Sequence, residues 1–226
     1  MRAMPALERT SQEPIFQIKV SLLQVEPTIW RRILVPAEVT LAELHYVVNE
    51  AMGWTGSHSH SFTFEKRSFG DLELDPHNEL KFEDESGVTL ESLADKGQKL
   101  NYEYDFGDGW EHEIEIENRV GFDARLAYPL CIGGARACPP EDSHGPLGYQ
   151  EFLAAIRDKT HPEHEQALTW IGGFFDPEGF DPNRTNLAIR EMYEGADCED
   201  CDGSCDCDHH GHGHDHDHDH GHGSKN

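Results

Sequence analysis

Four cysteines near the C-terminus have the spacing of metal ligands. They form a C-x2-C-x3-C-x-C pattern and lie at Cys198, Cys201, Cys205 and Cys207. Four thiolates at this spacing can surround a tetrahedral ion of soft or borderline character, and zinc is the leading candidate. Because Cys205 and Cys207 are so close in sequence, a histidine could replace one of them, or one could bind a different ion.

Eight histidines follow this cysteine cluster and alternate with glycine and aspartate. They are His209, His210, His212, His214, His216, His218, His220 and His222. Such a composition is typical of loose sites for Zn²⁺, Ni²⁺, Co²⁺ or Cu²⁺. A purification tag is usually a plain run of histidines, whereas here aspartates are interspersed and cysteines precede the run. We therefore expect this tail to bind Zn²⁺ or Ni²⁺, and we expect no organic cofactor.

Two histidines in the body of the chain, His58 and His60, form a second candidate metal site. On a strand both would face the same side and could offer two nitrogens to one ion. Phe62 and Phe64 share that side. The two histidines could therefore equally cap the polar end of an apolar face.

A turn and a loop in the middle of the chain hold further side chains with acid–base or metal chemistry. The catalytic candidates are Asp105, Asp108, His112, Glu141 and Asp142, and the candidate metal ligands of the loop are Cys131 and Cys138. A neutral imidazole on His112 beside a carboxylate would suit proton transfer or ion binding. The structural alternatives are a core position for His112, a turn-forming role for Asp105, and helix capping by Glu141 and Asp142.

The charge and hydropathy of the chain exclude several classes of protein. Its 226 residues carry 44 acidic and 18 basic side chains, a formal net charge of −26. Such a surface repels phosphates, so we expect no direct contact with nucleic acid. No apolar stretch is long enough for a membrane span or a secretory signal, which predicts a cytoplasmic protein with reduced cysteines and no membrane partner. The P-loop, dinucleotide-binding, zincin and α/β-hydrolase motifs are also absent.

The large apolar side chains are confined to the first 193 residues. From residue 194 onward there is no Leu, Ile, Val, Phe, Tyr, Trp or Met, so this segment cannot bury a core. Its ten acidic residues and one lysine give a charge of −9, which leaves −17 for the rest of the chain. We predict a flexible N-terminus at 1–13, one α+β domain at 14–193 and a disordered Cys/His/Asp-rich tail at 194–226.

Hydrophobic periodicity predicts the first elements of the domain. Residues 15–25 and 30–35 alternate as two strands of a hairpin. Thr40, with Glu43 three residues later, marks the start of a helix that ends at Gly53. Extended segments are then predicted at 59–65 and 79–83, and a helical turn at 89–95.

The clearest predicted hairpin pairs residues 100–106 with 110–117. Its Gly107-Asp108-Gly109 turn supplies the positive φ angles that a tight connection needs. Residues 128–148 are so rich in glycine and proline that we expect a long loop, and such loops usually carry function or are held in place. Helices are predicted at 149–157, 163–171 and 185–193. Together these elements predict a β-grasp-like mixed sheet roll packed by helices.

Five separated strings of sequence carry a family resemblance. They are IFQIKVSLLQVEPTIWRRILVP (15–36), LHYVVNEAMGW (44–54), YDFGDGWEHEIEIE (104–117), CIGGARACPPEDSHGPLGY (131–149) and GFFDPEGFDPNRTN (173–186). With these strings in this order, residues 14–193 resemble the pRiA4b ORF-3-like family, which is named after an open reading frame of a plasmid. The resemblance implies a domain of unknown function, sometimes joined to small zinc-binding modules, and it lends no established catalytic residues.

The leading functional hypothesis is a cytosolic binding or interaction domain whose tail binds divalent transition metals. Its role would be metal buffering or metal-dependent binding of another protein. The first alternative is an enzyme with a site between the 105–112 turn and the 131–142 loop. The second alternative, which rests on the family name, is an accessory protein of a mobile element that acts through protein partners.

Overall fold

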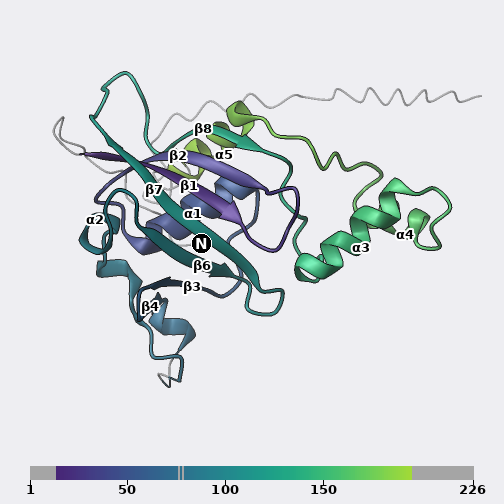
Figure 1. Ribbon diagram of the computed structural model, residues 1–226, viewed down its shortest axis with the longest axis horizontal. Helices are drawn as coiled ribbons and strands as arrows, with labels where there is room; N and C mark the ends of the chain where they lie inside the picture. The colour runs from purple at the N-terminus through teal and green to yellow at the C-terminus, as the bar shows by residue number, and fades with distance from the viewer. Residues whose placement is uncertain (1–13, 76, 78, 195–226) are drawn as a thin grey trace, which may run out of the picture.

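The chain folds around one large β-sheet. The computed structural model describes residues 14–75, 77 and 79–194. Within these residues, eight strands form a mixed sheet in the order β5-β4-β3-β6-β7-β1-β2-β8 (Figure 1), and only β4 and β5 pair in parallel. The strands are β1 (Ile15–Leu22), β2 (Trp30–Pro36), β3 (His60–Phe64), β4 (Arg67–Gly70), β5 (Glu83–Asp84), β6 (Lys99–Tyr104), β7 (Trp110–Val120) and β8 (Leu130–Ala135).

Helices accompany the sheet and complete an α+β fold. The α-helices of the described residues are α1 (Leu41–Met52), α2 (Leu90–Leu93), α3 (Gly145–Arg157), α4 (His164–Trp170) and α5 (Pro182–Glu194). Two short 3-10 turns, η1 (Leu72–Leu74) and η2 (Glu85–Gly87), lie on either side of β5. The predicted α+β class, a mixed sheet packed by helices, is confirmed.

Helix α1 begins and ends where its sequence predicts. The Thr40 hydroxyl accepts a hydrogen bond from the Glu43 amide at 3.2 Å, and the Glu43 carboxylate accepts one from the Thr40 amide at 2.9 Å. This reciprocal capping box satisfies two amides that the first turn leaves unpaired. The helix stops at Gly53, whose φ of 99° is costly for a residue with a Cβ atom.

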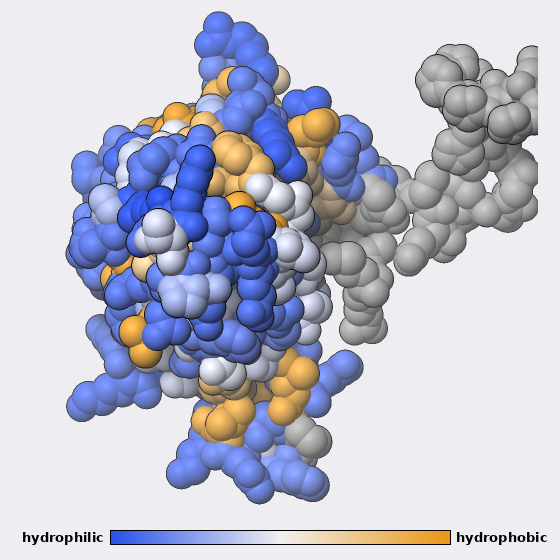
Figure 2. All heavy atoms as spheres, turned by 90° about the vertical axis from the view of Figure 1, so that its right-hand side faces the viewer, coloured by the Kyte–Doolittle hydropathy of each residue, from blue (hydrophilic) through white to orange (hydrophobic). Residues whose placement is uncertain are grey.

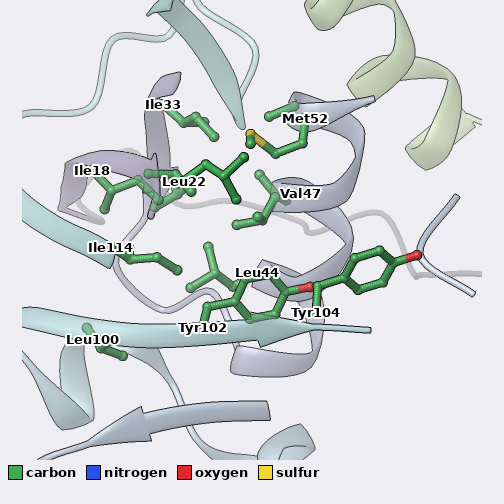
Figure 3. Close-up of a cluster of buried hydrophobic side chains, with 14 of the residues drawn as sticks. Ile18, Leu22, Ile33, Leu44, Val47, Met52, Leu100, Tyr102, Tyr104 and Ile114 are labelled. Carbon is green, nitrogen blue, oxygen red and sulfur yellow. The ribbon is translucent and has the colours of Figure 1, made fainter. Parts of the chain in front are cut away.

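The hydrophobic core lies between the sheet and α1. In Figure 3, side chains from β1, β2 and β7 point toward the helix, and those of Leu44 and Val47 point back. The sheet contributes Ile18, Ile33 and Ile114, which like both helix residues are fully buried. Burial of each such side chain contributes roughly 1.5–3 kcal/mol. The apolar side chains that recur every second residue in the strands therefore pack in one layer against those that recur about every 3.6 residues in α1.

The β6–β7 hairpin forms as predicted, but its turn differs. Strand β6 ends at Tyr104 because Asp105 adopts a φ of 56°, and the left-handed residues of the turn are Asp105 and Gly109 rather than Gly107. The Asp105 carboxylate accepts hydrogen bonds from the amides of Gly107 at 3.0 Å and Asp108 at 3.3 Å. Phe106, which the predicted strand 100–106 included, instead lies in the turn and is 37% exposed.

The glycine-rich stretch expected to be a continuous loop contains edge strand β8. It pairs with β2, with Trp30 opposite Ala135 and Ile33 opposite Cys131. At Gly134 an added Cβ atom would lie 2.8 Å from the Trp30 carbonyl oxygen. Glycine therefore allows the two strands to approach, and the prediction of a loop throughout 128–148 was wrong because this contact is non-local.

Helices α3 and α4 form a pair that extends from the side of the sheet (Figure 1). The buried His164 donates a hydrogen bond from Nδ1 to the Ala155 carbonyl at 2.8 Å. The Phe152 and Trp170 rings meet edge to face with centroids 5.3 Å apart. These contacts fix α4 on α3, while α5 packs against α1 and β8.

The face of the molecule at the right-hand side of Figure 1 is mostly hydrophilic (Figure 2). Hydrophobic residues gather in the upper part of the view and at its lower end, and Figure 1 shows β4 toward the lower end. Leu72, Leu74 and Leu80 of the segment after β4 are about half exposed. No helix within the described ranges has the length and apolar character needed to cross a bilayer. The predicted N-terminus at 1–13 and the tail from residue 195 lie outside the described residues.

Candidate binding groove

A groove of about 530 Å³ opens between the C-terminal end of α1, the loop after β8 and the segment that leads into α5. We call it the Phe174 groove. Its apolar lining includes Met52, Ala137, Phe174, Phe175 and Phe180, and its charged lining consists of Arg31, Glu50, Asp176, Asp181 and Arg184. Binding sites for small ligands and peptide side chains fall in this range of volume.

The buried side chain of Arg31 joins the elements that surround this groove. Its Nε donates to the Ala51 carbonyl at 2.8 Å, and its Nη1 donates to the carbonyls of Trp30 at 2.9 Å and Ala135 at 3.1 Å. The Phe180 ring packs on the guanidinium with its centroid 4.4 Å from Cζ. Burial lowers the pKa of Arg31. Arg31 thus fixes α1, β2, β8 and the segment before α5 relative to one another.

The aromatic wall of the groove is presented by a turn after α4. Gly172 and Gly173 have φ angles of 81° and 104°, which favour glycine. They turn the chain so that Phe174 is 79% exposed, while Phe175 packs against the core. Phe174 therefore lies on the surface beside the groove rather than in the core.

Glu141 ties the loop after β8 to the sheet. Its Oε1 accepts hydrogen bonds from the Tyr104 hydroxyl at 2.8 Å and from the amide and hydroxyl of Thr55 at 3.1 and 3.0 Å. Burial, and then the neighbouring Glu141, raises the pKa of Tyr104 to about 12. The Trp54 indole donates to the Pro139 carbonyl at 2.9 Å in the same region. The predicted catalytic carboxylate Glu141 therefore has a structural use.

The His58 side chain reaches the hairpin turn. Its Nδ1 lies 3.4 Å from Oδ2 of Asp105, whose other oxygen holds the turn. The ring also meets Tyr104 edge to face at 5.7 Å. The structure thus brings His58, Asp105, Tyr104 and Glu141 into one polar cluster at the end of β6.

Sequence comparison places this architecture in a family. The model of the plasmid pRiA4b ORF-3-like proteins matches residues 14–184. The chain belongs to this family. The uncharacterized protein y4hQ of Sinorhizobium fredii is 37% identical over 183 residues, which cover 79% of this chain and 92% of that protein.

A solved crystal structure has the same fold as this chain. The crystal structure of MM3350, a protein of unknown function from Methanosarcina mazei Go1, superposes with a TM-score of 0.69. It is 35% identical and covers 76% of this chain and 97% of its own. This pRiA4b ORF-3-like domain thus shares its fold with a solved protein of unknown function.

Four of the five strings that carry the family resemblance meet at the Phe174 groove. They supply Arg31, residues 50–53 at the end of α1, Ala137 with Cys138, and eight residues between 174 and 185. The fifth string, 104–117, is joined to the loop through Tyr104 and Glu141. Separated parts of the pRiA4b ORF-3-like sequence therefore converge on one concave surface.

The remaining candidates in the loop and hairpin lie in different surroundings. His112 is fully buried, its Nδ1 donates to the Tyr102 carbonyl at 3.3 Å, and burial lowers its pKa to about 4. Asp108 turns its carbonyl toward Gly145 at the start of α3, and Asp142 is exposed. His112 bonds to the Tyr102 carbonyl rather than to Asp105 or Glu141, so it stays outside the polar cluster that contains those two carboxylates.

The candidate ligands of the body do not gather around one point. His60 pairs with the buried Glu85, both of whose oxygens lie 3.0 Å from its Nε2, while His58 contacts Asp105. Burial raises the pKa of both Cys131 and Cys138, which disfavours their thiolate forms. Within residues 14–75, 77 and 79–194, no three His, Cys, Asp or Glu side chains are placed to hold a metal ion. The cysteines and histidines of the tail lie outside these residues.

A buried polar network behind β6 was not predicted. The rings of His45 and His60 stack with centroids 3.5 Å apart, and the Tyr102 hydroxyl lies 2.8 Å from Nδ1 of His45 and 2.9 Å from Nδ2 of Asn49. Burial, and then the charge of His60, lowers the pKa of His45 to about 3. The available signal was the position of His45 and Asn49 on the buried face of α1, beside Leu44 and Val48.

Proposed function

We propose that this protein is a binding protein rather than a catalyst, with two binding parts. The folded domain would accept a partner in the Phe174 groove, and residues 198–222 would bind divalent transition metals. The observation that carries the first part is the convergence of four separated strings on one groove with an exposed aromatic wall. The second part rests on the residue types and spacing of the tail.

The chemistry of the groove indicates the kind of partner. Phe174 and Phe180 offer aromatic surface, and Glu50, Asp181 and Arg184 place charges of both signs around it. An apolar or aromatic group with polar substituents, on a small molecule or on a peptide, would match this lining. In contrast, the acid–base candidates Glu141 and His112 are engaged in contacts that hold the fold.

The tail would contribute metal binding that depends on pH. Thiolate and neutral imidazole are the forms that bind metal, so protonation competes with the ion. Affinity would fall as the pH drops through about 6, where imidazoles become charged. Because the tail follows α5, which lines the Phe174 groove, metal binding could buffer ions or influence the partner bound in the groove.

A fragment screen by NMR tests the Phe174 groove. In the isotopically labelled full-length chain, bound fragments should shift the amide signals of residues 172–185 and of the C-terminal end of α1. Phe174→Ser should abolish these shifts without changing the fold, since Phe174 is 79% exposed. Leu187→Ser, an equally polar change at a 52% exposed position outside the groove, is the matched control. Fragments that bind elsewhere, or that bind the Phe174→Ser chain equally well, would rule out this site.

Calorimetric titration of Zn²⁺ and Ni²⁺ tests the tail. Three full-length chains are compared: the natural sequence, a variant with serine at the four tail cysteines, and a variant with asparagine also at the eight tail histidines. The first should bind the most ions, the second fewer, and the third none. Equal stoichiometry and affinity in all three would refute metal binding by the tail.

A further inference from the structure

A second groove, which goes beyond the proposed function, lies on the α3–α4 pair. It encloses about 510 Å³ between α4, one face of α3 and the loop that precedes α3. We call it the Trp170 groove. Its floor is apolar: Phe152 and Ala155 are buried, whereas Trp170 is 48% and Leu147 69% exposed. The two exposed side chains and the two buried ones thus form one apolar surface within the groove.

The charges around this groove all have the same sign. Asp142, Glu151 and Glu163 line it and are exposed to solvent. No lysine or arginine is among the residues that line it. A charged occupant is therefore attracted only if it is cationic, while anions such as phosphate are repelled.

The framework of the groove is held in place before anything binds. His164 donates to the Ala155 carbonyl at 2.8 Å, and the Phe152 ring contacts Trp170. Ser143 at the other end donates to the Pro140 carbonyl at 2.6 Å. A preformed groove binds without the entropic cost of ordering its own walls. The α3–α4 pair also extends away from the sheet, which leaves it accessible to a large partner (Figure 1).

We propose that the Trp170 groove docks a short segment of another protein that carries apolar side chains flanked by lysine or arginine. An amphipathic helix laid into a groove places apolar anchors on the floor and cations at the rim, which complements this lining. The acidic rim opposes nucleic acids and anionic lipid surfaces. A second copy of this chain is disfavoured by its own net charge of −26.

Two synthetic peptides test the proposal against the full-length chain. One is an amphipathic helix with leucines on one face and lysines on both flanks; its twin has glutamate at every lysine. Affinities are measured by fluorescence anisotropy at an ionic strength of about 0.15 M, where weak surface attraction is screened. We expect the lysine peptide to bind at least tenfold more tightly than its twin. Leu147→Ser should weaken the affinity for the lysine peptide at least tenfold, while Leu187→Ser on α5 should leave this affinity unchanged.

A charge-reversed pair separates docking from general attraction to an acidic protein. Glu151→Lys with Glu163→Lys should reverse the preference in favour of the glutamate peptide. Glu38→Lys with Glu165→Lys makes the same change in net charge at exposed positions outside the groove and should preserve the preference. Equal effects of the two charge pairs, no binding of the lysine peptide, or a dimer in sedimentation that Leu147→Ser abolishes would each overturn the proposal.

Discussion

Acidification from pH 7.5 to pH 5 should destabilise this protein through two buried histidines. Burial lowers the pKa of His45 to about 3 and that of His112 to about 4, against an ordinary value of 6.5 in the unfolded chain. Between these values the unfolded chain binds protons that the folded chain does not. Stability is therefore fully present above pH 6.5 and is lost as the pH falls below it.

The expected loss can be worked from these values. Each proton bound only by the unfolded chain lowers the free energy of unfolding by roughly 1.4 kcal/mol for each unit that the pH falls. From pH 6.5 to pH 5 each histidine therefore lowers the free energy of unfolding by roughly 2 kcal/mol, and the two together lower it by roughly 4 kcal/mol. Because both folded pKa values lie below 5, both histidines stay mostly neutral in the folded chain over this range. A loss of this size is a large fraction of the stability of a typical domain.

Urea unfolding followed by circular dichroism at pH 7.5 and pH 5 measures this loss. His112→Phe keeps an aromatic ring beside Trp54 and removes one titrating group, so its loss should be smaller by roughly 2 kcal/mol. His144→Asn is the control, because His144 is exposed and its φ of 61° suits asparagine. If His112→Phe lost as much stability as the natural sequence and the control, burial of a neutral His112 would be the wrong explanation.

Three further changes probe the contacts that shape the domain. Thr40→Ala removes the capping box of α1 and should lower the free energy of unfolding by about 1 kcal/mol in urea denaturation; no measurable loss would contradict the cap. Glu141→Ala should speed hydrogen exchange of residues 136–144, as read by mass spectrometry, because the tether to the sheet is lost; unchanged exchange would show that other contacts hold the loop. Arg31→Met leaves the Ala51 carbonyl without its donor and should lower the thermal midpoint, with a loss of roughly 2 kcal/mol or more; a variant as stable as the natural sequence would contradict this role of Arg31.

Local signals in the sequence predicted the parts of the fold that depend on local contacts. The capping box at Thr40 and the stop at Gly53 each depend on neighbouring residues, and β6 pairs with β7 across a short turn. Helices α3, α4 and α5 were found near their predicted positions because each carries an amphipathic pattern. In these segments propensity and tertiary packing favour the same structure.

The parts that sequence reasoning missed depend on residues that are far apart in the chain. Strand β8 forms because Gly134 lets it approach Trp30, about a hundred residues earlier. The stacked pair of His45 and His60 likewise joins a helix to a strand. The same holds for the Phe174 groove: each string that lines it is visible in the sequence, but only the fold shows that they meet.

The metal content of the chain purified without added metal tests the proposed function most directly. Elemental analysis is done on the natural full-length sequence and on the variant that lacks the tail cysteines and histidines. We predict bound zinc or nickel in the natural chain and none in the variant. A natural chain that contains no transition metal, and takes up none from a micromolar solution of zinc or nickel, would contradict the proposal, as would equal metal content in both chains.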